Sequence, residues 1–251
     1  MLKRVVVALL VLAMVGGLLL VASCKRQPSQ KIVIATDATW PPMEMVNESK
    51  EIVGFDIDLM NAAAKAGGFA VEFKNTAWDG IFAGLEAGEY DAVMSSVTIT
   101  DERKQNMDFS VPYINAGQIL VVPKATKGVT KLSDLKKKTV GAQIGTTGAF
   151  EIEKVKGVMP KTYDEIGLAF EDLINGRIAG IVCDTPVAAN YALQNEKYKG
   201  KLKIVGEPFT QEYYGVVVKK GNTALIEMIN KGIDKVMGTK QYAEFEKKWL
   251  R

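Results

Sequence analysis

From residue 32 onward, short apolar runs typical of buried strands alternate with segments whose apolar residues recur at helical spacing. This alternation is typical of open α/β sheets. Helical spacing predicts two C-terminal helices over residues 223–236 and 239–249, and we expect Asp56 to begin an earlier helix over residues 59–66. The strand-like runs are 32–36, 70–73, 91–94, 118–122, 139–142, 179–183, 203–205 and 214–219.

The first residues have the pattern of an export signal. A basic start is followed by an apolar run over residues 5–22, which ends in Val21-Ala22-Ser23-Cys24. Small residues directly before a cysteine fit a lipoprotein cleavage site, so we expect a signal peptide over residues 1–23 and lipidation of Cys24. The lipid would anchor an exported protein on the periplasmic or cell-surface side, through a tether over residues 24–30. The apolar run is also just long enough for a short transmembrane anchor.

Charge and composition narrow the chemistry. Removal of residues 1–23 takes away Lys3 and Arg4, so the formal charge falls from +3 to +1, which argues against a nucleic-acid partner. The sequence has no histidine, which excludes histidine-based catalysis and a Cys/His metal site. With Cys24 acylated, Cys183 is the only thiol left, and no intrachain disulfide is expected. The sequence therefore predicts neither a cofactor nor a metal.

Small hydroxyl residues at the end of a buried strand lead directly into a helix start that carries one arginine. Ser95-Ser96-Val97-Thr98 follows the strand-like run, Thr100 fits a helix N-cap, and Arg103 lies in the first turn. The helix dipole disfavours a cation there unless an anion faces it. A guanidinium binds a carboxylate bidentately, and the hydroxyl and backbone oxygens before it suit an ammonium group, so the pattern predicts a site for a free amino acid. Taken alone, the stretch also fits an ordinary capped helix with a solvated arginine.

A helix–glycine–strand pattern occurs twice, 88 residues apart. Residues 82–96 and 170–184 match in the register of their apolar residues and glycine. Ser96 and Asp184 therefore fall at equivalent strand ends, where open α/β sheets bind ligands, and one polar strand end in each lobe predicts a cleft. Because the pattern is common in α/β proteins, a generic match is the alternative. A carboxylate at position 184 needs a cation such as an α-ammonium, unless it caps the next helix.

Two motifs carry a resemblance to a known family. Ser-Ser-x-Thr-Ile-Thr-Asp-Glu-Arg at residues 95–103 is followed by Asp-Phe-Ser-x-Pro-Tyr at 108–113. With them, the sequence from about Lys31 to Arg251 resembles the polar amino-acid-binding proteins of bacterial ABC importers, the type II periplasmic solute-binding proteins of family 3. The resemblance implies an α/β fold with two lobes, each a mixed β-sheet flanked by helices, joined by a hinge that the chain crosses twice.

The same resemblance sets the expected lobes and partners. Lobe 1 is expected to span residues 31–115 and 213–251, and lobe 2 residues 118–208, with crossings at 114–118 and 207–213. Such a protein would act as a monomer that closes on a free L-amino acid. It would deliver the ligand to a membrane permease whose ATPase is on a separate chain.

The resemblance also implies how the backbone of the ligand is held. Arg103 and the residue that matches Thr147 hold the α-carboxylate in the resembled family, and an aspartate that matches Asp184 holds the ammonium. Thr147 follows a strand and a glycine turn, where free backbone N–H groups suit an anion. The residues that we expect to contact the α-carboxylate and ammonium groups are Ser95, Ser96, Thr98, Arg103, Thr147 and Asp184.

The expected side-chain pocket consists of Asp37, Trp40, Trp78 and Gln143. The aromatic contacts of the family match the two tryptophans, whose faces together with Asp37 suit a flat guanidinium. Gln143 adds no second cation that would repel a basic ligand. We therefore expect arginine, with glutamine as the nearest competitor because its amide can also stack and form hydrogen bonds. Lysine and histidine fit less well, and glutamate would place a like charge against Asp37.

An enzyme is the alternative from another class. Cyclohexadienyl dehydratases resemble these proteins, and such activity needs an acid near the leaving hydroxyl of the substrate. Asp37 or Glu44 could serve as that acid. Asp184 as an ammonium holder fits an amino-acid binder more naturally, so we expect no enzymatic activity.

Overall fold

The computed structural model describes residues Lys31–Arg251. The predicted signal peptide 1–23, the lipidation site Cys24 and the tether 24–30 lie outside the described residues. Residues Lys31–Arg251 form a unit of their own, and every interaction given below lies within it. None of the helices in this unit has the length and apolar character needed to cross a bilayer.

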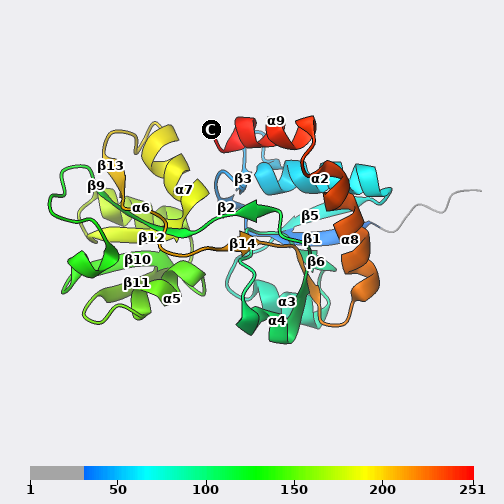
Figure 1. Ribbon diagram of the computed structural model, residues 1–251, viewed down its shortest axis with the longest axis horizontal. Coiled ribbons are helices and arrows are strands. Elements are labelled where there is room, and N and C mark those ends of the chain that lie inside the picture. The colour runs from blue at the N-terminus through cyan, green and yellow to red at the C-terminus, as the bar shows by residue number, and fades with distance from the viewer. Residues whose placement is uncertain (1–30) are drawn as a thin grey trace, which may run out of the picture. The chain divides into compact units, whose positions relative to one another are not determined.

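The first of two five-stranded sheets has the strand order β5-β1-β6-β15-β7. Figure 1 labels three of its strands, β5, β1 and β6. β1 pairs in parallel with both β5 and β6, whereas β15 is antiparallel to β6 and to β7. The strands are β1 (Ile32–Thr36), β5 (Val71–Asn75), β6 (Ala92–Val93), β7 (Met107–Phe109) and β15 (Val217–Lys219).

The second sheet, with the order β11-β10-β12-β9-β13, repeats this arrangement. β10 is parallel to β11 and β12, and β9 is antiparallel to β12 and β13. The central strands β6 and β12 occupy equivalent places, as the 88-residue repeat predicts. We call the part of the chain built on the first sheet the first lobe and the other the second lobe. The strands are β9 (Gln118–Pro123), β10 (Thr139–Gln143), β11 (Met159–Tyr163), β12 (Gly180–Asp184) and β13 (Leu202–Val205).

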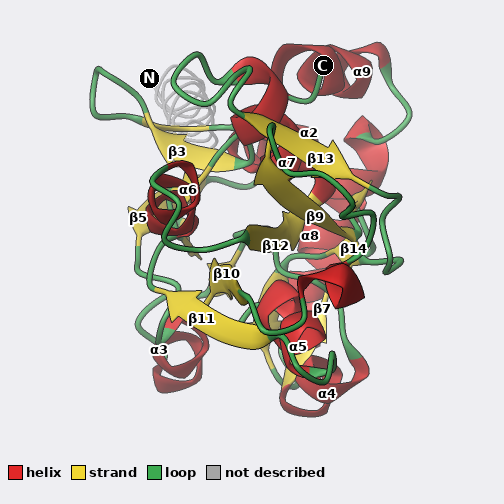
Figure 2. Ribbon diagram, turned by 90° about the vertical axis from the view of Figure 1, so that its left-hand side faces the viewer, coloured by secondary structure: helices red, strands yellow, loops and turns green. Residues whose placement is uncertain are grey.

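Helices cover both faces of each sheet, because alternate side chains of the strands point to opposite sides. In the first lobe, Ile34 of β1 packs in the cluster of α2 (Phe55–Gly67) and α8 (Thr223–Val236), and Ala35 packs with α3 (Ile81–Ala87). In the second lobe, Cys183 packs on the side of α6 (Ile166–Ile174) and Val182 on that of α5 (Thr147–Glu153) (Figure 2). The C-terminal helix α9 (Lys240–Trp249) packs on α2, and Trp249 Nε1 donates to Asp58 Oδ2 at 2.7 Å.

Shorter elements complete the fold. β2, β3 and β4 form a small antiparallel sheet, and α4 follows the hydroxyl-rich segment after β6. Their bounds are β2 (Thr39–Trp40), β3 (Glu44–Val46), β4 (Ile52–Val53), α4 (Asp101–Asn106), the 3₁₀ helix η1 (Leu132–Leu135), α7 (Thr185–Ala189) and the π-helical turn η2 (Asn190–Gln194).

Two segments connect the lobes and lie side by side. β8 (Ile114–Asn115) pairs with β14 (Tyr213–Tyr214), and Ala116 N–H donates to Glu212 O at 2.9 Å. The two backbones come very close at Gly117, where a Cβ atom would lie 2.1 Å from Thr210 O. Only glycine fits there, so the contact is part of the connection itself.

The predicted strands are confirmed, but several strands with few apolar residues were not predicted. Each of the eight runs overlaps a strand, although the run 214–219 is divided between β14 and β15. The prediction missed β7, β8 and β11, as well as the sheet of β2, β3 and β4. β11 is an exposed edge strand with Pro160 and Lys161, which lacks the apolar character on which the prediction relied.

The prediction that Asp56 begins a helix at residue 59 is wrong. Helix α2 begins at Phe55, and Gly54 precedes it without a side-chain cap. The Asp56 side chain is fully buried and turns away from the helix end. It accepts from Ser96 N–H at 3.0 Å and from Tyr113 Oη at 2.7 Å, so it supports the segment after β6 instead.

Candidate functional site

Polar side chains gather at the carboxyl ends of the parallel strands in both sheets. Asp37 follows β1 and Ser95-Ser96 follows β6, both in the first lobe. Gln143 ends β10 and Asp184 ends β12 in the second lobe. Carboxyl ends of parallel strands are where open α/β sheets bind ligands, and here the two sets face each other across one cavity.

The cavity is lined by polar and aromatic side chains from both lobes. All ten residues predicted as ligand contacts line it, and so does Thr146, which the prediction missed. Their role in binding stays a prediction. The lining residues are Asp37, Trp40, Trp78, Ser95, Ser96, Thr98, Arg103, Gln143, Thr146, Thr147 and Asp184.

Side chains from the two lobes touch each other around the cavity. Gln143 Nε2 donates to Asp37 Oδ2 at 2.8 Å, and Arg103 Nη2 donates to Gly145 O at 3.2 Å. The Oγ1 atoms of Thr98 and Thr147 are 3.5 Å apart. These distances require that the lobes be closed on each other.

Arg103 is held in place by the start of α4. As predicted, Thr100 caps this helix, and its hydroxyl accepts from Arg103 N–H at 3.1 Å. The guanidinium donates to Thr98 O at 2.9 Å and lies 5.6 Å from the ring centre of Trp78 and 5.3 Å from that of Phe82. Burial lowers the pKa of Arg103, although a guanidinium stays charged in proteins. Its charge is therefore available inside the cavity.

Asp184 is a buried carboxylate that lacks a cationic side chain as a partner. It is 5% exposed and accepts from Gln118 Nε2 at 3.0 Å. Although it precedes α7, its side chain makes no capping hydrogen bond, so the capping alternative does not apply. Burial, and next the charge of Glu212, raises the pKa of Asp184 to about 7. Within residues 31–251, neither Asp184 nor Arg103 takes part in an ion pair between side chains.

The other end of the cavity has an acidic group beside aromatic rings. Asp37 accepts from Thr39 Oγ1 at 2.7 Å as well as from Gln143, and burial raises its pKa. Among the described residues, Gln143 Oε1 and Trp40 Nε1 are buried without a hydrogen-bond partner. Buried polar groups are normally paired, so polar atoms of a ligand at this end of the cavity would satisfy these two groups.

Two buried acids lie below Ser95 and Ser96: Glu44, considered above only as the acid of the dehydratase alternative, and Asp56, expected above at a helix start. The Ser95 and Ser96 hydroxyls donate to the Glu44 carboxylate at 3.3 and 3.2 Å, and Asp56 accepts from Ser96 N–H. Burial, followed by the Asp56 charge, raises the pKa of Glu44 well above its usual range, and burial raises that of Asp56 to about 6. Ser96 has a φ of +50°, which is unfavourable for a residue other than glycine. The acids thus hold Ser96 in a strained conformation at the edge of the cavity.

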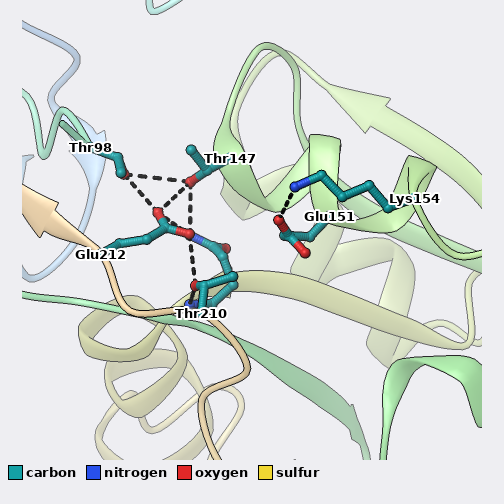
Figure 3. A network of polar contacts seen from close by, with 7 residues as sticks. Thr98, Thr147, Glu151, Lys154, Thr210 and Glu212 are labelled. Atoms are coloured by element: carbon teal, nitrogen blue, oxygen red, sulfur yellow. Dashed lines mark hydrogen bonds and ion pairs between the residues drawn. The ribbon is translucent and has the colours of Figure 1, made fainter. Parts of the chain in front are cut away.

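Glu212, in the second connection between the lobes, was also missed. Figure 3 shows its carboxylate between Thr98 and Thr147. It accepts from Thr98 Oγ1 at 2.9 Å and from Thr147 Oγ1 at 2.7 Å. Only the run Gln211-Glu212-Tyr213 within a predicted crossing hinted at a polar residue in the hinge.

The arrangement suits binding of a zwitterion. It offers a cation and a carboxylate for the two charged groups of an α-amino acid and an acidic, aromatic end for a side chain. Between Lys31 and Arg251, no group of three or more Cys, Asp and Glu residues is arranged to hold a metal ion.

Comparison with known proteins gives consistent matches over the same residues. The family model of the bacterial extracellular solute-binding proteins, family 3, matches residues 32–251. A protein of Neisseria gonorrhoeae named as a probable histidine-binding protein is 41% identical over 233 residues, which are 91% of this chain and 86% of that protein.

Solved structures match over most of the chain as well. An ancestral arginine-binding protein bound to arginine is 41% identical, covers 90% of this chain and 100% of its own, and superposes with a TM-score of 0.83. The same description is given for a structure bound to glutamine, at 42% identity, 88% and 97% coverage and a TM-score of 0.82. An ancestral amino-acid-binding protein described as a precursor of cyclohexadienyl dehydratase is 34% identical, with 88% and 96% coverage and a TM-score of 0.81.

Proposed function

Because this chain belongs to family 3 of the bacterial extracellular solute-binding proteins, we propose that it captures a free polar or basic L-amino acid, arginine foremost, for an ABC importer. The observation that carries this proposal is a pair of opposite charges, the half-buried Arg103 and the buried Asp184, that line one cavity between the lobes. The proposed ligand contacts are those predicted from the sequence.

The α-amino acid group is matched by charges that lack counter-ions among the side chains. The guanidinium of Arg103 would bind the α-carboxylate, and the Asp184 carboxylate would bind the α-ammonium. Leaving the buried Asp184 carboxylate unpaired costs several kcal/mol in general, about 3–5 kcal/mol where one partner of a pair is removed. A zwitterionic ligand removes this cost and also gives the half-buried Arg103 a counter-ion.

The end of the cavity that would hold the ligand side chain favours a hydrogen-bond donor. Asp37 and the unpaired Gln143 Oε1 are both acceptors, and the tryptophans offer flat faces. A guanidinium has five N–H donors and stacks on aromatic rings, so it suits this end best. Glutamine is the second candidate, since its amide has two donors, and lysine and histidine follow. Structures of an ancestral arginine-binding protein with arginine and with glutamine support this pair of ligands.

The dehydratase alternative finds little support in the geometry. Of the two candidate acids, Asp37 lines the cavity and burial raises its pKa, but it accepts hydrogen bonds from Thr39 and Gln143. The other is Glu44, whose pKa burial raises well above its usual range. Its carboxylate lies behind the Ser95 and Ser96 hydroxyls and does not line the cavity formed by the described residues. An acid that donates to a substrate must be within hydrogen-bond distance of it.

The remaining parts of the proposal rest on the sequence and the family. We propose an exported monomer with lobes at residues 31–115 with 213–251 and at 118–208, whose closed form docks on a permease. Lipidation of Cys24 after removal of residues 1–23 would anchor it to the membrane. Metabolic labelling with a fatty acid, compared between the full chain and Cys24→Ala, tests the anchor: label on the variant would contradict it.

Calorimetric titration tests the ligand. A soluble 27–251 fragment keeps the whole described unit and is unfolded and refolded first, to remove any ligand carried over from the cell. It is then titrated separately with arginine, glutamine, lysine, histidine and glutamate. Tight and preferential arginine binding is the expected result. Preference for glutamine would keep the transport function and change the ligand, whereas no binding of any amino acid, together with turnover of prephenate or arogenate, would favour the enzyme.

A further inference from the structure

Glu212 places a buried carboxylate directly behind the cavity, between the two lobes. It is 9% exposed, and its Oε2 atom accepts from Thr98 Oγ1 and Thr147 Oγ1, with Gln118 Nε2 at 3.3 Å (Figure 3). Its Oε1 atom accepts from Thr210 Oγ1 at 2.7 Å. None of the ion pairs among residues 31–251 involves Glu212. Its charge is thus held by neutral donors alone.

These contacts fix the direction of two hydroxyl groups. An ionised carboxylate only accepts hydrogen bonds, and a hydroxyl has one proton to give. Thr98 and Thr147 must therefore both donate to Glu212. Their oxygen atoms can then only accept from a group in the cavity, which suits a ligand ammonium and not a ligand carboxylate.

The two hydroxyl oxygens lie close to Asp184. Gln118 Nε2 donates to both Thr147 Oγ1 and Asp184 Oδ1 at 3.0 Å, so these two acceptors share one donor and lie at most twice that distance apart. Thr98 Oγ1 is 3.5 Å from Thr147 Oγ1, and all three residues line the cavity, whereas Glu212 is not among its described lining residues. An ammonium group has three N–H donors, and three acceptors converge here.

We propose that Glu212 is a positioning residue for the α-ammonium of the ligand, because it turns the Thr98 and Thr147 hydroxyls into acceptors that complete the Asp184 site. The proposal rests on the function proposed above. The expected contact of Thr147 with the α-carboxylate then falls to its backbone N–H, because the hydroxyl proton is committed to Glu212. Since Thr98 and Thr147 belong to different lobes, Glu212 completes the site only when the lobes close.

The test compares two ligands that differ only in the ammonium group. Arginine and 5-guanidinopentanoic acid, which lacks the α-amino group, are titrated calorimetrically against the 27–251 fragment and against its Glu212→Ala, Glu212→Gln and Glu207→Ala variants. Glu212→Ala is expected to weaken arginine binding by roughly 10- to 100-fold, the usual effect of losing a hydrogen bond to a charged group. Binding of 5-guanidinopentanoic acid is expected to change by less than about threefold, since no ammonium is present to lose its acceptors.

The other variants separate hydroxyl orientation from charge. The amide oxygen of Glu212→Gln can accept from both hydroxyls, so arginine binding should stay within about fivefold of the parent. Glu207→Ala removes an exposed carboxylate from the same connection and should change neither ligand. If Glu212→Ala does not fold, as judged by circular dichroism, Thr98→Val gives the same test: it should weaken arginine far more than 5-guanidinopentanoic acid.

Three results would overturn the inference. Equal losses for both ligands would indicate a role in lobe closure only, and a loss in Glu212→Gln as large as in Glu212→Ala would assign the effect to charge. In both cases the parent still binds amino acids, so the proposed function survives. If the unmodified fragment binds no α-amino acid, the proposed function fails, and this inference fails with it.

Discussion

Proton release on binding gives the sharpest test of the proposed site, because a proton and a ligand ammonium compete for Asp184. Burial, and next the Glu212 charge, raises the pKa of Asp184 to about 7. The ammonium requires the ionised carboxylate, so ligand binding must displace any proton that Asp184 carries. Affinity for an α-amino acid should therefore fall as the pH falls.

The magnitude follows from the ionised fraction. With a pKa of about 7, Asp184 is about half ionised at pH 7, about one-tenth at pH 6 and about one-hundredth at pH 5. Well below pH 7, the dissociation constant should rise about tenfold for each pH unit, or about 1.4 kcal/mol. Each binding event at pH 6 should release about 0.9 proton from Asp184.

Calorimetry measures both quantities. The 27–251 fragment is titrated with arginine at pH 5, 6, 7 and 8, in two buffers whose ionisation enthalpies differ, so that the heat difference counts released protons. Asp184→Asn should bind arginine weakly. The dissociation constant of this variant should no longer rise as the pH falls, and its binding should release no proton at pH 6. Asp234→Asn, which changes an exposed carboxylate on α8, should keep both.

A dissociation constant that stays constant between pH 5 and 7, or the absence of proton release at pH 6, would refute the reasoning. Asp56 also titrates near pH 6, but it is still present in Asp184→Asn. The difference between the parent and this variant therefore isolates Asp184.

Three further substitutions test other parts of the structure. Arg103→Ala should weaken arginine binding at least about 100-fold, because charge-assisted bidentate bonds are lost, with the fold retained in circular dichroism; affinity within tenfold of the parent would remove Arg103 from the site. Asp37→Asn should weaken arginine at least about tenfold and glutamine less than about threefold in calorimetry, because only arginine loses an ion pair; equal losses would contradict a guanidinium contact. Asp56 binds its proton more tightly in the folded state, since burial raises its pKa to about 6; its contribution to stability is complete below about pH 4 and is lost as the pH rises through about 6. Asp56→Asn, which can still accept from Tyr113, should reduce this decline in urea unfolding between pH 4 and 7, and an unchanged decline would contradict it.

The sequence was sufficient for those parts of the site that lie at strand ends. Parallel strands bring their carboxyl ends to one edge of a sheet, so a polar residue directly after an apolar run can be located without coordinates. Asp37, Ser95 and Asp184 were all found in this way, and each lines the cavity. The apolar pattern locates each strand, and the preference of ligands for strand ends then identifies the residues of the site.

The parts that were missed depend on contacts between segments far apart in the chain. Glu44 reaches Ser96 from 52 residues away, and Glu212 reaches Thr98 from 114 residues away. Neither glutamate follows a regular strand of the sheets, so no local pattern marks it. Their burial is decided by how the connections and the small sheet pack, which hydrophobic periodicity does not report.

Charge balance in the cavity is our reason for proposing a basic ligand over a neutral one. In the proposed site, the Arg103 guanidinium would pair with the ligand carboxylate, and the Asp184 carboxylate, with Glu212 behind it, would pair with the ammonium. Asp37 then remains at the far end with hydrogen bonds from neutral groups only. A neutral side chain leaves that charge buried and unpaired, a glutamate adds a like charge, and a guanidinium compensates it. Selection at this end therefore depends on the ligand's charge as well as on its shape, and glutamine fits best when Asp37, whose pKa burial raises, carries a proton.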